Sequence, residues 1–177
     1  MTMKLLTTNT SSNASASAFT SSIDSTYKVY VFKFYDINAA TDGVKFTFQG
    51  STDGGSNYNT AITSTYFASY HYEGDSDADM GYDGGQDLAQ GTGYQPLCND
   101  VGNDADQSEA GVLYIFAPSS TTFAKNFIVK SNQCGAGDYM QEQFAAGYFN
   151  TTSAINAVNF KMSSGNFDGT IKMYGVA

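Results

Sequence analysis

Four closely spaced aspartates form the one cluster in the sequence that resembles a metal site. They are Asp75, Asp77, Asp79 and Asp83. Alternating carboxylates can converge on Ca²⁺, as they do in an EF-hand loop. The pattern departs from that loop because Met80 stands where glycine is needed and Gln86 stands where a bidentate glutamate is needed. The segment is therefore either a Ca²⁺ site of another kind or a solvated acidic loop tip, and no other cofactor is expected.

Three tyrosines in glycine-rich segments are candidate binding residues. They are Tyr82, Tyr94 and Tyr139. Aromatic rings in loops can stack on sugar rings or anchor a protein contact. The alternative is that these rings pack back onto the body of the domain, and the sequence leaves both readings open.

Catalytic residues are sparse in this chain. His71 is the single histidine, and the neighbouring sequence holds no motif for a serine or cysteine nucleophile. A pair of carboxylates for glycoside hydrolysis would have to draw on Glu73, Glu109 and Glu142, because these are the only glutamates. We therefore expect a protein that is not an enzyme, with His71 as a structural or surface imidazole.

The composition predicts an all-β fold that could position such residues. Charged residues make up 14% of the 177, well below the roughly 25% of an ordinary soluble domain. The 13 Tyr and 13 Phe suit half-buried strands, whereas the abundant Gly, Asn, Asp and Ser suit turns. The length is that of one domain.

The charge balance bears on the partners of the protein. The formal net charge is −9. Nucleic acids and anionic membranes both require clustered positive charge, so neither is an expected partner. The first residues turn polar too soon for a secretory signal, which predicts synthesis in a cytoplasm. In that reducing compartment Cys98 and Cys134 are expected to be free thiols.

Alternating aromatic and polar residues predict about eight strands. The predicted strands cover residues 27–35, 44–49, 58–72 (one long or two short strands), 111–117, 126–130, 148–149, 155–162 and 170–176. Residues 73–107 show no period and are expected to form a long acidic loop, and residues 133–147 a second, glycine-rich loop. This number of strands predicts a two-sheet antiparallel sandwich of the jelly-roll kind.

The two ends of the chain carry different expectations. Residues 1–26 are rich in Ser, Thr, Ala and Asn and predict an arm, either flexible or ordered by adding to a neighbouring subunit's sheet. Residues 27–177 then form a single β-sandwich domain. At the other end, residues 160–162 and 170–176 are expected to pair as a hairpin whose loop uses Gly165 and Gly169. The last strand is expected to complete the core.

Three segments carry a resemblance to a known group. These are residues 19–32, continuing into 40–49, then residues 111–120 (Gly-Val-Leu-Tyr-Ile-Phe-Ala-Pro-Ser-Ser), then residues 164–176 (Ser-Gly-Asn-Phe-Asp-Gly-Thr-Ile-Lys-Met-Tyr-Gly-Val). Their order and content resemble small virion proteins of tailed bacteriophages from marine and aquatic bacteria, which end in a similar Ser-Gly…Gly-Thr-Ile-Lys-Tyr-Gly pattern. The resemblance implies a structural role in the virion and supplies no catalytic motif.

We therefore expect a virion subunit that is assembled in the host cytoplasm. In the first hypothesis it is a capsid decoration, cement or appendage protein that assembles as a trimer or other ring. Its arm and sheet edges would bind other copies and the major capsid or tail proteins. The alternative is a tail-fibre tip domain that binds a host receptor or glycan through Tyr82, Tyr94 and Tyr139. A hydrolase is the third and least favoured hypothesis.

Overall fold

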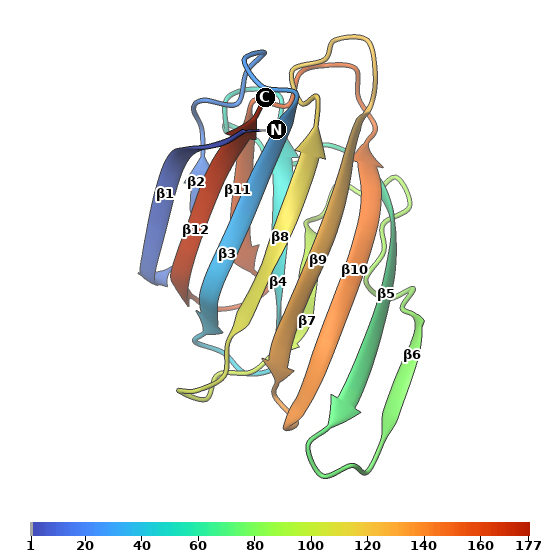
Figure 1. The fold of residues 1–177 in the computed structure, drawn as a ribbon. Coiled ribbons are helices and arrows are strands. Elements are labelled where there is room, and N and C mark those ends of the chain that lie inside the picture. The colour runs from blue at the N-terminus through green and yellow to red at the C-terminus, as the bar shows by residue number, and fades with distance from the viewer. Residues whose placement is uncertain (1) are drawn as a thin grey trace.

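The computed structural model describes residues 2–177, which form antiparallel strands joined by turns and loops (Figure 1). This confirms the predicted all-β class. The strands are β1 (Met3–Ala14), β2 (Ser17–Phe19), β3 (Val29–Ala39), β4 (Val44–Ser51), β5 (Ile62–Tyr72), β6 (Ala78–Tyr82), β7 (Gln95–Val101), β8 (Glu109–Phe116), β9 (Lys125–Gly135), β10 (Tyr139–Phe149), β11 (Ala157–Met162) and β12 (Phe167–Val176). Among residues 2–177 there is no helix long and apolar enough to span a membrane.

The strands form one antiparallel sheet that is nearly closed into a barrel. The first part of the sheet has the order β1-β12-β3-β8-β9-β10-β5-β6, and the second part has the order β7-β4-β11-β2. The two parts are joined where Val101 of β7 pairs with Gly135 of β9. In Figure 1 the first part faces the viewer, and β4, β7 and β11 lie behind it. We call the face of the first part that turns away from those strands the outer face.

Aromatic side chains fill the space between the two parts of the sheet. On β3, Tyr30, Phe32 and Phe34 point inward and are fully buried. The ring centre of Phe32 lies 5.3 Å from that of Phe19 and 5.4 Å from that of Phe160. Aromatic pairs at such distances contribute about 0.5–1.5 kcal/mol each beyond the apolar area that they bury. The period of two in residues 27–35 therefore reflects one inward, aromatic side of a central strand.

The N-terminal residues lie within the sheet. The structure pairs β1 with β12 of the same chain, and β2 with β11. The Asn9 side-chain amide donates to the carbonyl of Ala18 over 3.0 Å, which connects β1 to β2. Residues 3–14 and 17–19 thus gain their order from the chain's own sheet, whereas the sequence predicted an arm over residues 1–26. Met1 of that arm lies outside the described residues.

The C-terminal strand completes the sheet, but its neighbours differ from those predicted. β12 lies between β1 and β3, and β11 lies between β4 and β2. The predicted hairpin of residues 160–162 with 170–176 is therefore wrong, because the two strands belong to different parts of the sheet. The glycine positions were identified correctly: Gly165 has a φ of 74° and Gly169 a φ of 138°, both in the region that favours glycine.

Two segments predicted to be irregular contain strands. Residues 73–107 include β6 and β7, and residues 133–147 include the end of β9 and most of β10. β9 and β10 pair in register over their whole length, from Lys125 with Phe149 to Gly135 with Tyr139. Periodicity failed there because the inward positions between residues 131 and 145 are filled largely by glutamine, serine and alanine. These residues do not give an apolar alternation even when they are buried.

Candidate functional site

A continuous row of large side chains crosses the outer face. Leu5, Tyr174, Val31, Tyr114 and Ile128 are successive register neighbours on β1, β12, β3, β8 and β9. Leu5 is 49% exposed and Ile128 48% exposed, whereas Val31 is covered by its neighbours. A row of apolar side chains over five strands is unusual for a solvated sheet face, whose residues are normally polar. This row is the candidate functional site.

The row borders an apolar groove of about 550 Å³ at one end of the outer face. The groove is lined by Met3, Val29, Val31, Tyr114, Phe116, Ile128 and Val176. Each lining residue has an apolar side chain or an aromatic ring, so the groove offers little to a charged ligand. Exposed apolar patches of this kind mark contacts with proteins, membranes or ligands.

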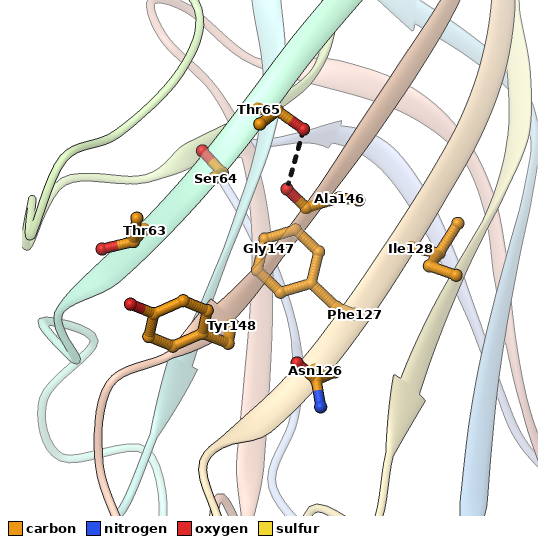
Figure 2. Close-up of a pocket in the computed structure, with 9 residues that line it drawn as sticks. All are labelled: Thr63, Ser64, Thr65, Asn126, Phe127, Ile128, Ala146, Gly147 and Tyr148. Carbon is orange, nitrogen blue, oxygen red and sulfur yellow. Dashed lines mark hydrogen bonds between the residues drawn. The ribbon is translucent and has the colours of Figure 1, made fainter.

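A second hollow of about 420 Å³ adjoins the groove across Ile128. Figure 2 shows its floor at Ala146 and Gly147, with Tyr148 on one side and Ile128 on the other. A side chain at Gly147 would not fit, because a Cβ there would lie 2.5 Å from the carbonyl oxygen of Thr63. Gly147 faces inward, where its Cβ would also meet the ring of Phe127. The small outward side chain in this hollow is that of Ala146.

Lysines stack on aromatic rings in the next row of the outer face. The Lys33 ammonium lies 5.6 Å from the ring centre of Tyr174, and that of Lys172 lies 5.5 Å from the ring centre of Tyr35. Lys33 and Lys172 are register partners. Within residues 2–177 neither forms an ion pair, whereas Lys130 on the same face binds Glu142 over 2.9 Å. The outer face is thus apolar with a positive border.

The outer face continues onto the β5–β6 hairpin, which extends beyond the body of the sheet in Figure 1. Phe67 of β5 stacks on Phe144 of β10, with ring centres 5.0 Å apart and an interplanar angle of 11°. Tyr82 of β6 is the register partner of Phe67, and Met80 lies two residues before it on the same side. Met80 is 71% exposed and Tyr82 is 61% exposed.

The four predicted metal-binding aspartates lie along this hairpin, where each contacts a different group. The Asp75 carboxylate lies 3.0 Å from the His71 imidazole nitrogen Nε2, and Asp77 accepts a hydrogen bond of 2.9 Å from the Tyr70 hydroxyl. Asp79 accepts a hydrogen bond from the backbone amide of Met80, and Asp83 accepts one from the backbone amide of Gly85. In the part of the chain that the structure describes, no three His, Cys, Asp or Glu side chains gather as a metal site. The hairpin is a projecting acidic segment.

The three predicted tyrosines occupy three different environments. Tyr82 is exposed, and its hydroxyl donates to Asp87. The Tyr94 hydroxyl accepts a hydrogen bond of 3.0 Å from the side-chain amide of Asn159, and the Lys161 ammonium lies 4.2 Å from the ring centre of Tyr94. Tyr139 lies in β10 instead of a loop, is 9% exposed and bonds to Asp100. Burial is the main cause that raises the pKa of Tyr139. The structure therefore does not bring the three together.

A buried carboxyl group is the strongest electrostatic anomaly in the interior. Glu109 is fully buried, and neither of its carboxyl oxygens has a hydrogen-bond partner among residues 2–177. The nearby Cys98 thiol donates to Gln143 Oε1 over 3.0 Å. Burial raises the pKa of Glu109 well above its ordinary value, because the charged form would lose its hydration and the nearby Cys98 thiol offsets only part of that loss.

The remaining candidate catalytic residues are dispersed. His71 is exposed beside Asp75, and the two cysteines are free thiols, with Cys98 buried and Cys134 half-buried. Glu109 faces inward, as does its register partner Gln133, whereas Glu142 lies on the outer face beside Lys130. These two carboxyl groups lie on opposite sides of the sheet and cannot act on one glycosidic bond.

Sequence reasoning did not find the apolar row or the groove. Their residues come from the two ends and the middle of the chain, and only the strand register brings them together. The available signal was bulk on both sides of residues 27–35, where Val29 and Val31 alternate with aromatic residues. Comparison of the chain with protein-family models, with curated proteins and with solved structures gives no match.

Proposed function

We propose that this protein is a non-enzymatic structural subunit of a tailed-phage virion, a capsid decoration, cement or appendage protein. It would be made in the host cytoplasm and would assemble with other copies of itself, as a trimer or another ring, and with major capsid or tail proteins. The observation that carries the proposal is the apolar row with its groove of about 550 Å³ on the outer face. A face of this kind is stabilised when a protein partner covers it.

The order of pairing supports a two-sheet jelly roll as the finer description of the fold. When β5, β6, β9 and β10 are set aside, the first remaining strand pairs with the last (β1 with β12), and the second with the second-last (β2 with β11). The third pairs with the third-last (β3 with β8), and the two innermost strands, β4 and β7, pair with each other. This is the pattern of one long hairpin wrapped around a barrel. Jelly rolls build many viral capsid and lectin domains.

Two free sheet edges offer further contacts for assembly. β1 and β6 end the first part of the sheet, and neither has a backbone ladder on its other edge within residues 2–177, although the Asn9 side chain joins part of the β1 edge to β2. β1 runs for 12 residues with Lys4 as its one charged side chain. Long edges with little charge are templates for strand pairing unless a partner covers them. The arm and edge contacts expected from the sequence would therefore involve β1 as an already folded strand.

The distribution of charge supports protein partners over nucleic acid or membrane. Residues 73–107 contain nine of the 17 acidic residues and none of the eight lysines. Such a segment repels phosphate groups at physiological salt, because it lacks the positive charge that releases counterions. The three outer-face lysines stand against aromatic rings and do not form a broad basic patch.

A tail-fibre tip that binds a receptor or glycan is the alternative. Tyr82 favours it, because this ring is 61% exposed on a projecting hairpin beside the Phe67 and Phe144 pair. Tyr94 and Tyr139 give it less support, because one stacks with Lys161 and the other is buried. Glycan-array binding that is lost in Tyr82→Ala and retained in Tyr148→Ala would favour this alternative.

The test of the proposal is incorporation into particles. Phage that carry Ile128→Asp should release particles depleted of this protein, because the charge falls inside the groove. Asn132→Asp places the same charge on the same strand outside both hollows and should be incorporated normally. Quantitative mass spectrometry of purified particles gives the copy number. A wild-type protein that is missing from particles would refute the proposal.

A further inference from the structure

Three side chains with soft donor atoms form a row across the outer face, toward the end of β9 that lies away from the apolar groove. Met140 of β10 is the register partner of both Cys134 on β9 and His71 on β5. Directly opposed residues of antiparallel strands project to the same side, and their Cβ atoms lie about 4.5–5.5 Å apart. The Met140 side chain therefore stands between the thiol of Cys134 and the imidazole of His71.

The same three residues line a hollow of about 510 Å³. Met140 is 48% exposed and the His71 side chain 59% exposed, whereas Cys134 is half-buried. The other residues that line this hollow are Tyr72, Glu73 and Gln133. An ion from solution can thus reach all three donors without unfolding of the sheet.

The combination of donors selects the class of metal. Thiolate and thioether sulfur bind Cu(I), and imidazole also suits copper. Zn²⁺ is bound by Cys, His, Asp and Glu, and Ca²⁺ and Mg²⁺ are bound by oxygen. A thioether at the centre of the row therefore favours Cu(I) over these three ions.

The charges around the hollow favour a cation. The pKa of the Cys134 thiol is raised, chiefly by burial and then by the nearby carboxylates of Glu73, Asp106, Asp138 and Asp104. These carboxylates disfavour a bare thiolate, but they attract a cation, and a bound cation offsets the negative charge of the thiolate. No lysine is among the described residues that line the hollow.

The His71 ring has one contact to release before it can bind a metal through Nε2. That nitrogen lies 3.0 Å from the carboxylate of Asp75, and both side chains are exposed. An exposed contact of this kind contributes little to stability. The ring can therefore turn from Asp75 toward its register partner Met140.

We propose that His71, Cys134 and Met140 bind one Cu(I) ion per chain, with the ion above Met140 and between the other two side chains. Binding forms a copper–sulfur bond to the Cys134 thiolate and releases the proton of the thiol to solvent. An imidazole nitrogen and the thioether sulfur each donate a lone pair, and no oxidant or reductant takes part. The site lies apart from the apolar groove and does not depend on the proposed virion role.

The first experiment measures Cu(I) affinity by competition with the chromophoric chelator bicinchoninate, without oxygen and with ascorbate. Wild type should take up one Cu(I) per chain, and Cys134→Ser should lose this binding. Met140→Leu and His71→Gln should each weaken it about tenfold or more, because each removes a direct ligand. Met80→Leu is the matched control and should bind like wild type, because Met80 is 71% exposed on β6 and does not line the hollow. The proposal is overturned if wild type takes up no Cu(I), or if Met140→Leu and His71→Gln bind as tightly as wild type.

The second experiment locates the ion in the wild-type chain, because a substitution could also disturb the local fold. Ag(I) replaces Cu(I) here, since it shares the preference for sulfur and keeps its oxidation state in air. One equivalent should shift the NMR signals of the Met140 methyl group and the His71 ring and leave the Met80 methyl signal in place. It should also protect Cys134 from a thiol reagent. Protection of Cys134 without a shift at Met140 and His71 would show binding by the thiol alone and would overturn the three-donor site.

Discussion

Replacing the buried Glu109 with glutamine should stabilise the protein at neutral and alkaline pH. Both carboxyl oxygens are buried without partners, and the register partner Gln133 has an unpartnered Oε1. A protonated carboxyl or a glutamine amide can donate to that oxygen, whereas a carboxylate cannot. Removing an unsatisfied buried group of this kind changes the free energy of unfolding by about 1–3 kcal/mol, and by more when the group is charged.

The pH dependence gives the sign of the effect. Folding raises the pKa of Glu109 above its ordinary value of 4.5, so the folded state holds this proton more tightly than the unfolded state. The stability contributed by Glu109 is therefore complete below about pH 4 and is lost as the pH rises toward the folded-state pKa. Over that range the free energy of unfolding of the wild type should fall by about 1.4 kcal/mol per pH unit relative to that of Glu109→Gln.

Urea unfolding of both proteins at fixed chain concentration, from about pH 4 to pH 8, measures this difference. Glu142→Gln is the matched control, because Glu142 is half-buried on the outer face beside the exposed Lys130 and a surface ion pair contributes at most about 1 kcal/mol. The two proteins should be about equally stable at the lowest pH and diverge as the pH rises. The reasoning is refuted if the difference does not change with pH, or if Glu109→Gln is the less stable protein at pH 8.

Three further outcomes follow from single residues. Gly147→Ala should destabilise the fold by about 1–3 kcal/mol in urea, because its Cβ would meet the Thr63 carbonyl, whereas Gly81→Ala, whose Cβ meets open space, should not. A thiol reagent should label Cys134 in the native protein and reach Cys98 only on unfolding, because burial covers Cys98; rapid labelling of both would contradict its burial. The Asp53 carboxyl should titrate by NMR with a pKa of about 2, because Ser51 and Asn57 donate hydrogen bonds to it. Its contribution to stability is present above the unfolded-state pKa and lost as the pH falls toward 2, and an ordinary pKa would show that those bonds are not maintained in solution.

The sequence was sufficient for the all-β class and for the strands with aromatic alternation. Residues 27–35 and 170–176 form neighbouring strands of the sheet's first part because Tyr30, Phe32, Ile171 and Met173 all need the same buried side. It was insufficient where the interior is polar: Gln133, Gln141 and Gln143 are buried on β9 and β10, and no apolar period marks them. The pairing of strands could not be predicted either, because β1 pairs with β12 across almost the whole length of the chain.

The apolar row and its groove were not predicted, for a related reason, although residues of the neighbouring β5–β6 hairpin were singled out. Tyr82 was identified as a candidate binding residue and the aspartates around it as candidate metal ligands, because a polar, glycine-rich composition is visible along the chain. The groove was missed because Met3, Val29, Tyr114 and Val176 become neighbours only through the strand register. A surface made by long-range pairing has no local signature, and a structure is needed to find it.

Sedimentation equilibrium of the purified chain tests the central claim, that the outer face is a contact between copies. Wild type should show a mass that is a multiple of the 18.9 kDa chain, with three copies as the expected ring. Ile128→Asp should shift the mass toward one chain, and Asn132→Asp should not. A wild-type mass of one chain at every concentration, or an Ile128→Asp protein that assembles as well as wild type, would contradict the claim.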